Sequence, residues 1–268
     1  REKVKQMLNE METQGIIERT ECSQWVSPVV ITQKPDGSLR FCVDLRSLNR
    51  NIAIDTYPLP NINELIVMLS GGRYFSKLDL KSAYHQIPLH YESRSLTAFT
   101  TLEGIFQFTR LPFGLASAAS IFQRVMSNTL AGIENVIYFQ DDILVYTDTR
   151  EKHSVILGKV LERLCKAGLT LRKEKCKFMV TEVEYLGYTV NQDGVSPKKN
   201  LLLAIEKTAV PTTKEQLRSF LGLIEFYAKF IRNFADKTET LRVLLKKGAK
   251  FQWSSSQNDS FENIKKEL

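Results

Sequence analysis

Apolar side chains recur along this chain with two periods, one typical of helices and one typical of strands. A spacing of three and four residues predicts helices over residues 3–14, 62–69, 117–130 and 155–166. Runs of β-branched and aromatic residues predict strands over residues 25–32, 39–43, 74–80, 99–101, 106–109, 136–139, 143–146 and 184–190. After Pro197 the pattern is helical only, and Thr213 and Gln216 form a capping box. The sequence therefore predicts an α+β body to about residue 195, followed by a small helical domain.

Two of the predicted hairpins carry candidate site residues at or near their tips. Residues 34–37 form a turn signal that places Lys34 at one tip and Arg40 on the returning strand. A short polar segment containing Asp141 and Asp142 separates two apolar runs, which predicts a buried hairpin with adjacent carboxylates at its turn. Neither hairpin alone indicates a function.

Asp79 changes the interpretation of the Asp141–Asp142 pair. An adjacent pair of aspartates is expected by chance in a chain of this length, and a solvated turn would explain it. Asp79, however, lies at the end of an apolar strand, and two strands of one sheet can bring their terminal carboxylates together. Three carboxylates without a histidine favour hard divalent cations, magnesium above zinc. Two such ions about 3.5–4 Å apart would clamp an in-line phosphoryl displacement.

Lys34, Arg40 and Tyr84 are candidates for the same chemistry. Lysine and arginine hold phosphates, although a turn such as residues 34–37 is also an ordinary exposed loop. The ring of Tyr84, which follows shortly after Asp79, could pack against a deoxyribose or simply fill the core. Both alternatives stay open on the residues alone.

Composition removes several classes of protein. The 268 residues are 43% hydrophobic and 25% charged, which excludes a chain disordered throughout, a collagen-like fibre and a disulfide scaffold. No apolar run reaches the roughly 18 residues that would span a bilayer, and residues 1–12 lack the apolar core of a signal peptide. The chain begins with Arg1 and ends within a helical pattern, so we expect a piece of a longer protein.

Charge is distributed unevenly along the chain. Residues 151–268 carry 22 basic and 14 acidic side chains, whereas residues 1–150 carry 15 and 16. A basic half indicates a polyanionic partner, and a solvated lysine-rich surface is the alternative. The four cysteines and three histidines show neither C-x-x-C nor H-x-x-x-H spacing. They fit reduced thiols and packing or surface histidines, His85 included, better than a disulfide or zinc framework.

Several stretches resemble the reverse transcriptases of the gypsy class of LTR retrotransposons, which are similar to retroviral enzymes. The stretches, which occur in the family's order, are VDLRSLN (43–49), KLDLKSAYHQI (77–87), LPFGL (111–115), YFQDD (138–142), YLGY (185–188) and the segment 221–230. The resemblance covers nearly the whole chain. Two departures are the Phe139-Gln140 pair, where many relatives have Tyr-Val or Tyr-Met, and Phe113, where retroviral enzymes often have glutamine.

The resemblance implies a right-hand polymerase with fingers, palm and thumb. Fingers and palm would interleave over residues 1–195, with the palm core at about 71–92 and 110–195, and a helical thumb would occupy 196–268. The implied activity is that of an RNA-directed DNA polymerase, a nucleotidyltransferase that extends a primer 3′-hydroxyl with dNTPs on an RNA or DNA template. The implied cofactor is a pair of Mg²⁺ ions, for which Mn²⁺ can substitute.

The resemblance also assigns roles to individual residues. By similarity, the two metals are bound by Asp79, Asp141 and Asp142, and the Leu80 carbonyl completes the coordination shell of one of them.

The resemblance also implies residues that bind the nucleotide and the primer. Lys34 and Arg40 would grip the triphosphate, and Tyr84 would exclude ribonucleotides. The nucleotide pocket would be lined by Phe113 and Gly114. Lys175 would protonate pyrophosphate, with Lys173 and Lys177 as neighbouring alternatives. The primer grip would be formed by Tyr185, Leu186, Gly187 and Tyr188.

The partners implied by the resemblance are nucleic acids and further domains. The basic helices after residue 197 would follow the backbone of an RNA/DNA or DNA/DNA template-primer duplex, a contact that is sensitive to salt. RNase H and integrase domains of the same polyprotein and a dimeric assembly are further expectations, and no membrane partner is expected. The implied location is intracellular, in a cytoplasmic virus-like particle with a nuclear stage.

Two alternatives to the polymerase hypothesis stay open. The chain could be a nucleic-acid-binding structural subunit, or a domesticated relative with an idle polymerase fold. It could also be a polymerase that synthesises RNA. The three intact carboxylates argue against the first alternative, because an idle copy is free to lose them. Tyr84 argues against the second, because a gate that admits ribose needs a small or polar residue.

Overall fold

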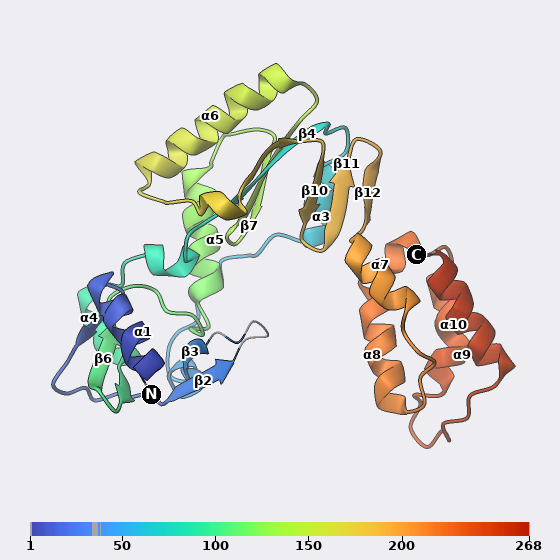
Figure 1. The fold of residues 1–268 in the computed structure, drawn as a ribbon, viewed down its shortest axis with the longest axis horizontal. Helices are drawn as coiled ribbons and strands as arrows, with labels where there is room; N and C mark the ends of the chain where they lie inside the picture. Colours follow the sequence, from blue (N-terminus) through green and yellow to red (C-terminus); the bar gives the residue numbers. More distant parts are fainter. Residues whose placement is uncertain (1, 34–36, 38, 268) are drawn as a thin grey trace. The chain divides into compact units, whose positions relative to one another are not determined.

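The computed structural model describes residues 2–33, 37 and 39–267 and divides into two compact units (Figure 1). Unit 1 is Arg1–Thr181 and unit 2 is Glu182–Leu268. Both contain helices and antiparallel sheets, which confirms the α+β class predicted from the sequence. The boundary predicted at residue 195 lies between the fingers and palm on one side and the thumb on the other. The division into compact units does not test it, so it stays a prediction.

Unit 1 contains most of the strands. Its elements, in chain order, are α1 (Glu2–Thr13), β1 (Ile17–Arg19), β2 (Val29–Gln33), β3 (Leu39–Val43), α2 (Arg46–Asn49), α3 (Ile62–Met68), β4 (Tyr74–Asp79), η1 (Ala83–Gln86), α4 (Tyr91–Arg94), η2 (Ser95–Thr97), β5 (Phe99–Thr101), β6 (Gly104–Phe108), α5 (Ala118–Thr129), β7 (Val136–Phe139), β8 (Asp142–Thr147), α6 (Arg150–Lys166), η3 (Lys173–Lys175) and β9 (Lys177–Val180).

The central sheet of unit 1 has the strand order β7-β8-β4-β9, with every neighbouring pair antiparallel. Side chains alternate between the two faces of a strand. Leu78, Ile143 and Val145 therefore share one face, where they form a buried core with residues of α5 and α6 such as Phe122 and Val160. Figure 1 shows α6 lying along this sheet. Residues 77, 79 and 142 fall on the opposite face.

Helix α6 begins earlier than predicted. It starts at Arg150 rather than residue 155, and Thr149 caps it by accepting a hydrogen bond from the Lys152 amide. The first turn of the helix is polar, so it contributes nothing to the apolar period from which the helix was predicted. His153, in this turn, is fully buried.

Two smaller sheets form the rest of unit 1. One has the order β1-β6-β5, and the other is the β2-β3 hairpin. Leu8 of α1 packs with Phe99 and Phe106 in a second core, and Trp25 packs against this core. The hairpin confirms the two strands predicted around residues 34–37, although the turn itself lies largely outside the described residues.

Unit 2 begins with a small sheet and continues with helices. Its elements are β10 (Glu182–Tyr185), β11 (Tyr188–Asn191), β12 (Gly194–Pro197), α7 (Lys199–Glu206), α8 (Lys214–Glu225), η4 (Ala228–Phe230), α9 (Phe234–Val243) and α10 (Ser255–Glu267). The prediction of one continuous strand over residues 184–190 is wrong. Leu186 and Gly187 have φ of +46° and +87°, so the chain turns back and β10 pairs with β11.

The helices of unit 2 enclose their own core, in which Phe220 and Phe261 lie 4.6 Å apart between ring centres. The capping box is confirmed in part: Thr213 accepts from the Gln216 amide, but the Gln216 side chain accepts from the Thr212 amide rather than from that of Thr213. No helix formed by residues 2–33, 37 and 39–267 has the length and hydrophobicity needed to cross a bilayer.

Candidate functional site

The pairing of β4 with β8 brings two of the predicted carboxylates together. Asp79 and Asp142 are directly opposite each other across the two strands, on the sheet face opposite the core that Leu78 forms with α5 and α6. Residues in such a pair have Cβ atoms about 5 Å apart, and like charges there are destabilising. Asp141 lies in the two-residue loop between β7 and β8, next to Asp142. The structure therefore places all three aspartates at one end of the sheet.

Two lysines lie beside these carboxylates. Lys77 Nζ is 3.0 Å from Asp142 Oδ1, a diagonal contact across the same sheet face. Lys175 Nζ, from η3, is 4.0 Å from Asp79 Oδ2. Each lysine offsets part of the repulsion between the two opposed aspartates. The contact of Lys175 with Asp79 places this predicted residue beside the carboxylates; Lys77 had no predicted role.

The pKa of the Asp141 carboxyl group is raised by its surroundings. Although the residue is exposed to solvent on one side, partial burial raises the pKa of its carboxyl group above the usual 3.8, and the charges of Asp142 and Asp79 raise it further. Lys77 and a backbone hydrogen bond act in the opposite direction. The charges of both other carboxylates therefore act on Asp141, so the three groups form one electrostatic cluster.

The chemistry of this donor set fits a divalent cation. Three carboxylates in mutual repulsion are stabilised by a hard cation that accepts oxygen ligands. Within residues 2–33, 37 and 39–267, no three His, Cys, Asp or Glu side chains already adopt a metal-binding arrangement. Lys77 and Lys175 supply the neutralising charge instead. To hold a cation, Asp142 and Asp79 would have to exchange their contacts with Lys77 and Lys175 for contacts with the ion.

The backbone of Asp79 is fixed independently of its side chain. Its carbonyl oxygen accepts a hydrogen bond from the Arg172 amide at 2.8 Å. Its amide donates to Cys176 Sγ at 3.4 Å. Leu80, the next residue, is 2% exposed and packs in the core below the sheet. The carboxylate of Asp79 thus projects from a rigid strand end.

The loop that carries Asp141 has an unfavourable backbone conformation. Gln140, its first residue, has a φ of +54°, in the left-handed region. This conformation costs a non-glycine residue roughly 1–2 kcal/mol. The Gln140 amide donates a 2.9 Å hydrogen bond to Oε1 of Gln123, a residue of α5 that is 1% exposed. The loop is therefore fixed from the helix behind it.

Aromatic rings lie beside the carboxylates. The ring of Tyr84 is 4.9 Å from that of Phe113 and 5.5 Å from that of Phe122. Burial and the charge of Asp141 raise the pKa of the Tyr84 hydroxyl above 10. That hydroxyl also lies 3.5 Å from Gln140 Oε1. Tyr84 and Phe113 are therefore brought together, and Tyr84 reaches the aspartate-bearing loop.

The loop after Phe113 is held by a residue without a predicted individual role. Gly114 has a φ of +90°, and its carbonyl accepts a hydrogen bond from Asn49 Nδ2 at 2.9 Å. Oδ1 of the same Asn49 accepts from the Ala116 amide at 2.8 Å. Asn49 thus clamps residues 114–116, while Phe113 remains 50% exposed.

Two predicted triphosphate-binding residues belong to the β2–β3 hairpin. Arg40 lies in β3 opposite Thr32, and its side chain is exposed. Lys34 lies outside the described residues. The hairpin belongs to a different sheet from the carboxylates, so its proposed role in the same site rests on the family resemblance.

The predicted primer-grip residues form the β10–β11 turn of unit 2. Tyr185 and Tyr188 are paired across the hairpin and almost fully buried, whereas Leu186 and Gly187 form the tip. The hydroxyl of Tyr227 donates a 2.9 Å hydrogen bond to the Gly187 carbonyl. The turn is therefore held by the segment that follows α8.

Aromatic packing surrounds this second turn. The Phe226 ring stacks on Tyr188 with 5.2 Å between centres. Lys229 Nζ lies 4.0 Å above the Tyr188 ring, and burial lowers the pKa of this amine. A Cβ atom at Gly187 would lie 3.3 Å from the Phe226 ring, so the close approach favours glycine.

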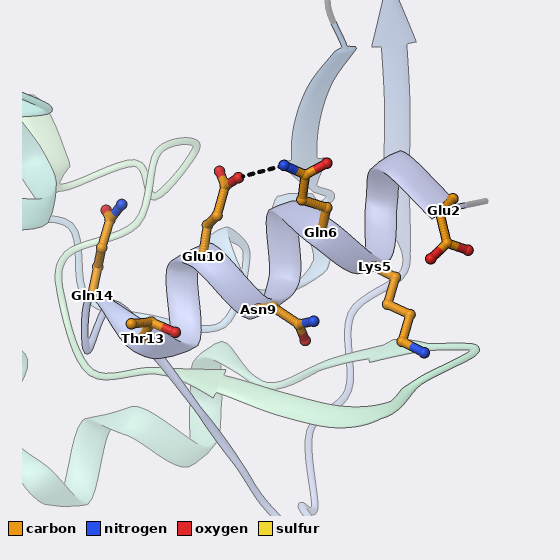
Figure 2. Close-up of a pocket in the computed structure, with 7 residues that line it drawn as sticks. All are labelled: Glu2, Lys5, Gln6, Asn9, Glu10, Thr13 and Gln14. Carbon is orange, nitrogen blue, oxygen red and sulfur yellow. Dashed lines mark hydrogen bonds between the residues drawn. The ribbon is translucent and has the colours of Figure 1, made fainter.

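A hollow on α1 contains none of the predicted site residues. It has a volume of about 460 Å³, and Figure 2 shows that its lining residues all come from this helix and the residue that follows it: Glu2, Lys5, Gln6, Asn9, Glu10, Thr13 and Gln14. Gln6 Nε2 donates to Glu10 Oε1 at 3.0 Å. Among the described residues no second element contributes to this lining, and in Figure 2 the side chains do not converge on a common point.

Sequence reasoning missed Lys77, Gln123 and the individual role of Asn49. Lys77 and Asn49 lie within stretches that resemble the family, so those stretches already pointed to them. Gln123 had one signal, a polar residue on the apolar face predicted for residues 117–130. A buried glutamine needs a hydrogen-bond partner, and the partner could not be identified from the helix alone.

Comparison with known proteins is consistent with this geometry. Residues 32–190 match the family described as reverse transcriptase (RNA-dependent DNA polymerase). The Pol polyprotein of transposon 297 from Drosophila melanogaster is 36% identical over 98% of this chain, and that of transposon opus from the same fly is 39% identical over 91%. The Tf2-3 polyprotein of Schizosaccharomyces pombe is 33% identical over 89%. The chain spans 25%, 25% and 18% of these relatives.

Solved structures extend the comparison to the fold. A foamy viral protease-reverse transcriptase in complex with double-stranded DNA matches 99% of this chain with a TM-score of 0.92 and 26% identity. The same kind of protein in complex with an RNA/DNA hybrid matches with a TM-score of 0.86 over 98%. The chain covers 47% and 36% of those two chains. These matches confirm the expected right-hand polymerase fold and the resemblance to retrotransposon enzymes: the chain belongs to the reverse transcriptase family.

Proposed function

We propose that this chain is the polymerase part of a retrotransposon reverse transcriptase. It extends the 3′-hydroxyl of a primer with dNTPs, using RNA or DNA as template. The observation that carries the proposal is the cross-strand pair of Asp79 and Asp142 with Asp141 in the adjoining loop, in a chain of the reverse transcriptase family. Reverse transcriptases use divalent metal ions, and a three-carboxylate donor set suits Mg²⁺, with Mn²⁺ as a substitute.

The three aspartates are proposed to hold two Mg²⁺ ions, with the Leu80 carbonyl as a further ligand. The ions, when bound, would activate the primer 3′-hydroxyl and stabilise the departing pyrophosphate. Lys175 lies 4.0 Å from Asp79, so its ammonium group can donate a proton to a leaving group at this site. Lys77 is proposed to neutralise Asp142 until the cations arrive.

The nucleotide is proposed to bind between the carboxylates and the aromatic residues. Tyr84 would exclude a 2′-hydroxyl with its ring, which Phe113 and Phe122 support. Phe113 and Gly114 would line the pocket, and Arg40 with Lys34 would grip the triphosphate. Tyr185, Leu186, Gly187 and Tyr188 would place the primer end.

The proposed partners are a template-primer duplex and neighbouring domains. The foamy viral neighbours are described with double-stranded DNA and with an RNA/DNA hybrid, which supports the same duplexes for this chain. Residues 1–195 would act as fingers and palm, and 196–268 as thumb along the duplex backbone. Because the relatives are retrotransposon polyproteins, RNase H and integrase domains, a dimer, and an intracellular, particle-associated location are proposed as well.

Primer extension tests the proposal. A DNA primer annealed to an RNA template is incubated with dNTPs and Mg²⁺ or Mn²⁺, and wild type is compared with Asp141→Asn. The isosteric amide removes one ligand charge, and we expect extension to fall by at least about 10³-fold. Asp148→Asn is the matched control and should keep full activity, because Asp148 is an exposed aspartate just before α6.

Two outcomes would contradict the proposal. A folded wild type that binds the duplex without extending it would favour an idle, nucleic-acid-binding subunit. Extension with ribonucleotides at rates equal to dNTPs would favour an RNA-synthesising polymerase and remove the proposed role of Tyr84.

A further inference from the structure

Gln123 connects a helix to the loop that carries Asp141. It lies in α5, one residue after Phe122, whose ring supports Tyr84. Its side chain is 1% exposed, and Oε1 accepts the Gln140 amide at 2.9 Å. Gln123 also lines a pocket of about 330 Å³ formed by residues 57–60, α3, α5 and β7. Gln123 is thus a buried polar residue on the apolar face of a core helix.

The geometry of the β7–β8 hairpin explains why this hydrogen bond matters. Phe139 and Asp142 are paired, so Gln140 and Asp141 form a two-residue loop. Such loops favour glycine where φ is positive, yet Gln140 occupies that position at +54°. The Gln140 amide points to α5 rather than to a neighbouring strand, so its hydrogen bond is to a side chain.

The same loop connects Asp141 with Tyr84. The Gln140 side chain lies 3.5 Å from the Tyr84 hydroxyl, and the next residue is Asp141. A change in φ or ψ of Gln140 would therefore move the Asp141 carboxylate and the partner of the Tyr84 hydroxyl together. The adjacent Asp142 is fixed separately, by strand pairing with Asp79.

We propose that Gln123 is a positioning residue for nucleotidyl transfer: its amide oxygen holds Gln140 in the left-handed conformation and so aims Asp141 at the reacting groups. This inference rests on the proposed function and deepens it. Gln123 touches no substrate; it acts through the Gln140 amide. Only the hydrogen-bond acceptor is needed, so glutamate, which burial and the nearby carboxylates keep in its neutral form, can replace glutamine. Methionine, of similar length, has no such acceptor.

Three variants test the inference. Gln123→Met removes the acceptor, Gln123→Glu keeps it, and Met126→Leu alters a fully buried side chain of the same helix without touching the loop. The first readout is hydrogen exchange of the peptide containing residues 139–142 in the metal-free protein. We expect the Gln140 amide to be protected in wild type, Gln123→Glu and Met126→Leu, and to lose protection in Gln123→Met.

The second readout is single-turnover primer extension at varied Mg²⁺ concentration. A displaced carboxylate costs between about tenfold and a hundredfold in rate. We therefore expect Gln123→Met to lower the maximal rate by that factor and to raise the half-saturating Mg²⁺ concentration. Glutamate should restore most of the rate, and Met126→Leu should leave both quantities unchanged.

The two readouts distinguish failure of the inference from failure of the proposed function. Retained protection of the Gln140 amide in Gln123→Met, or an unchanged rate despite lost protection, would overturn the positioning role while leaving the polymerase intact. Lost protection in Gln123→Met with no extension by wild type would leave the hydrogen bond established and the proposed activity refuted, and the catalytic role of Gln123 would fall with it.

Discussion

Two hairpin turns of this molecule have the same construction and opposite surroundings. The β7–β8 loop of unit 1 and the β10–β11 turn of unit 2 each contain at least one left-handed residue, and in each a side chain from a neighbouring segment hydrogen-bonds to the turn's backbone. Gln123 holds the first turn and Tyr227 holds the second. The first carries carboxylates that repel one another, whereas the second is enclosed by stacked aromatic rings.

The comparison shows two ways in which the backbone of a turn is held in place. The aromatic turn is stabilised by its own packing, so its hydrogen bond adds to an already favourable arrangement. The carboxylate loop gains little from its surroundings, since partial burial and like charges both disfavour ionised Asp141. Its geometry therefore depends on the helix behind it. We infer that the conformation of the aspartate-bearing loop depends on α5, whereas the aromatic turn is held largely by its own packing.

The chain offers a separate optical probe for each unit. Trp25 packs against a core of unit 1 and Trp253 against the core of unit 2, and they are the two tryptophans of the sequence. Single-tryptophan variants, Trp25→Phe or Trp253→Phe, let urea unfolding of each unit be followed by fluorescence. The three predictions that follow use these two signals.

The largest expected stability change is at Gly187. Alanine there would adopt a φ of +87° and place its Cβ 3.3 Å from the Phe226 ring, so we expect a loss of about 2 kcal/mol in the Trp253 signal. The Trp25 signal should not change. Gly222→Ala in α8 is the matched control, because its Cβ meets no atom within 4 Å; it should stabilise by roughly 0.5–1 kcal/mol. Equal effects of the two substitutions would contradict the packing argument.

A drop in pH should affect unit 1 more than unit 2. The three histidines of the sequence, His85, His90 and His153, all lie in unit 1. Burial lowers the pKa of His85 from 6.5 to about 4, and it also lowers the pKa of His153, which is hydrogen-bonded to Ser76 and Thr147. The folded state disfavours both imidazolium forms. Stability is therefore complete above about pH 6.5 and is lost as pH falls toward 4.

The size of this effect follows from the His85 shift. Between pH 7 and pH 5 the free energy of unfolding of unit 1 should fall by about 2 kcal/mol from His85 alone, at 1.36 kcal/mol per pKa unit. The Trp25 signal reports it, and His85→Phe should flatten the pH dependence. An equally steep loss in the Trp253 signal would show that groups other than histidine dominate.

The smallest expected change in stability is a gain rather than a loss. Gln140→Gly relieves the cost of the left-handed backbone, partly offset by greater freedom in the unfolded chain, so the Trp25 signal should report a gain of about 0.5–1 kcal/mol. Activity should not improve, because Tyr84 loses its contact with the Gln140 side chain. A loss of stability would mean that this contact outweighs the backbone strain.

Much of the fold was predictable where one apolar face was continuous. Helix α5 and the β7–β8 hairpin are within a residue or two of prediction, because their periods are uninterrupted. Strand β9 was missed because its residues are exposed or only half-buried and show no alternation. The break at residues 186–187 was missed because the sequence from Glu184 to Val190 is typical of a single strand. Only the left-handed backbone of Leu186 and Gly187 divides it into two strands.

The candidate site, too, was predictable in part. The three aspartates were identified from their places at the end of a strand and in a turn, and from the family resemblance. Their contacts could not be predicted, because Lys77 reaches Asp142 only through the register of β4 and β8. Gln123 likewise acquires its role from the packing of α5 against a loop distant in sequence. A local pattern specifies a residue's element, and tertiary register specifies its neighbour.

The two lysine contacts have a consequence for the order of assembly. Because Lys77 and Lys175 already screen Asp142 and Asp79, we expect the newly made chain to complete its sheet in a cation-poor solution. Under the proposed function, cation loading would be an exchange in which an incoming ion displaces an ammonium group that is tethered nearby. Such a tethered competitor returns when the ion departs, so the sheet end would survive repeated cycles of filling and emptying without exposing an unscreened cluster of charge.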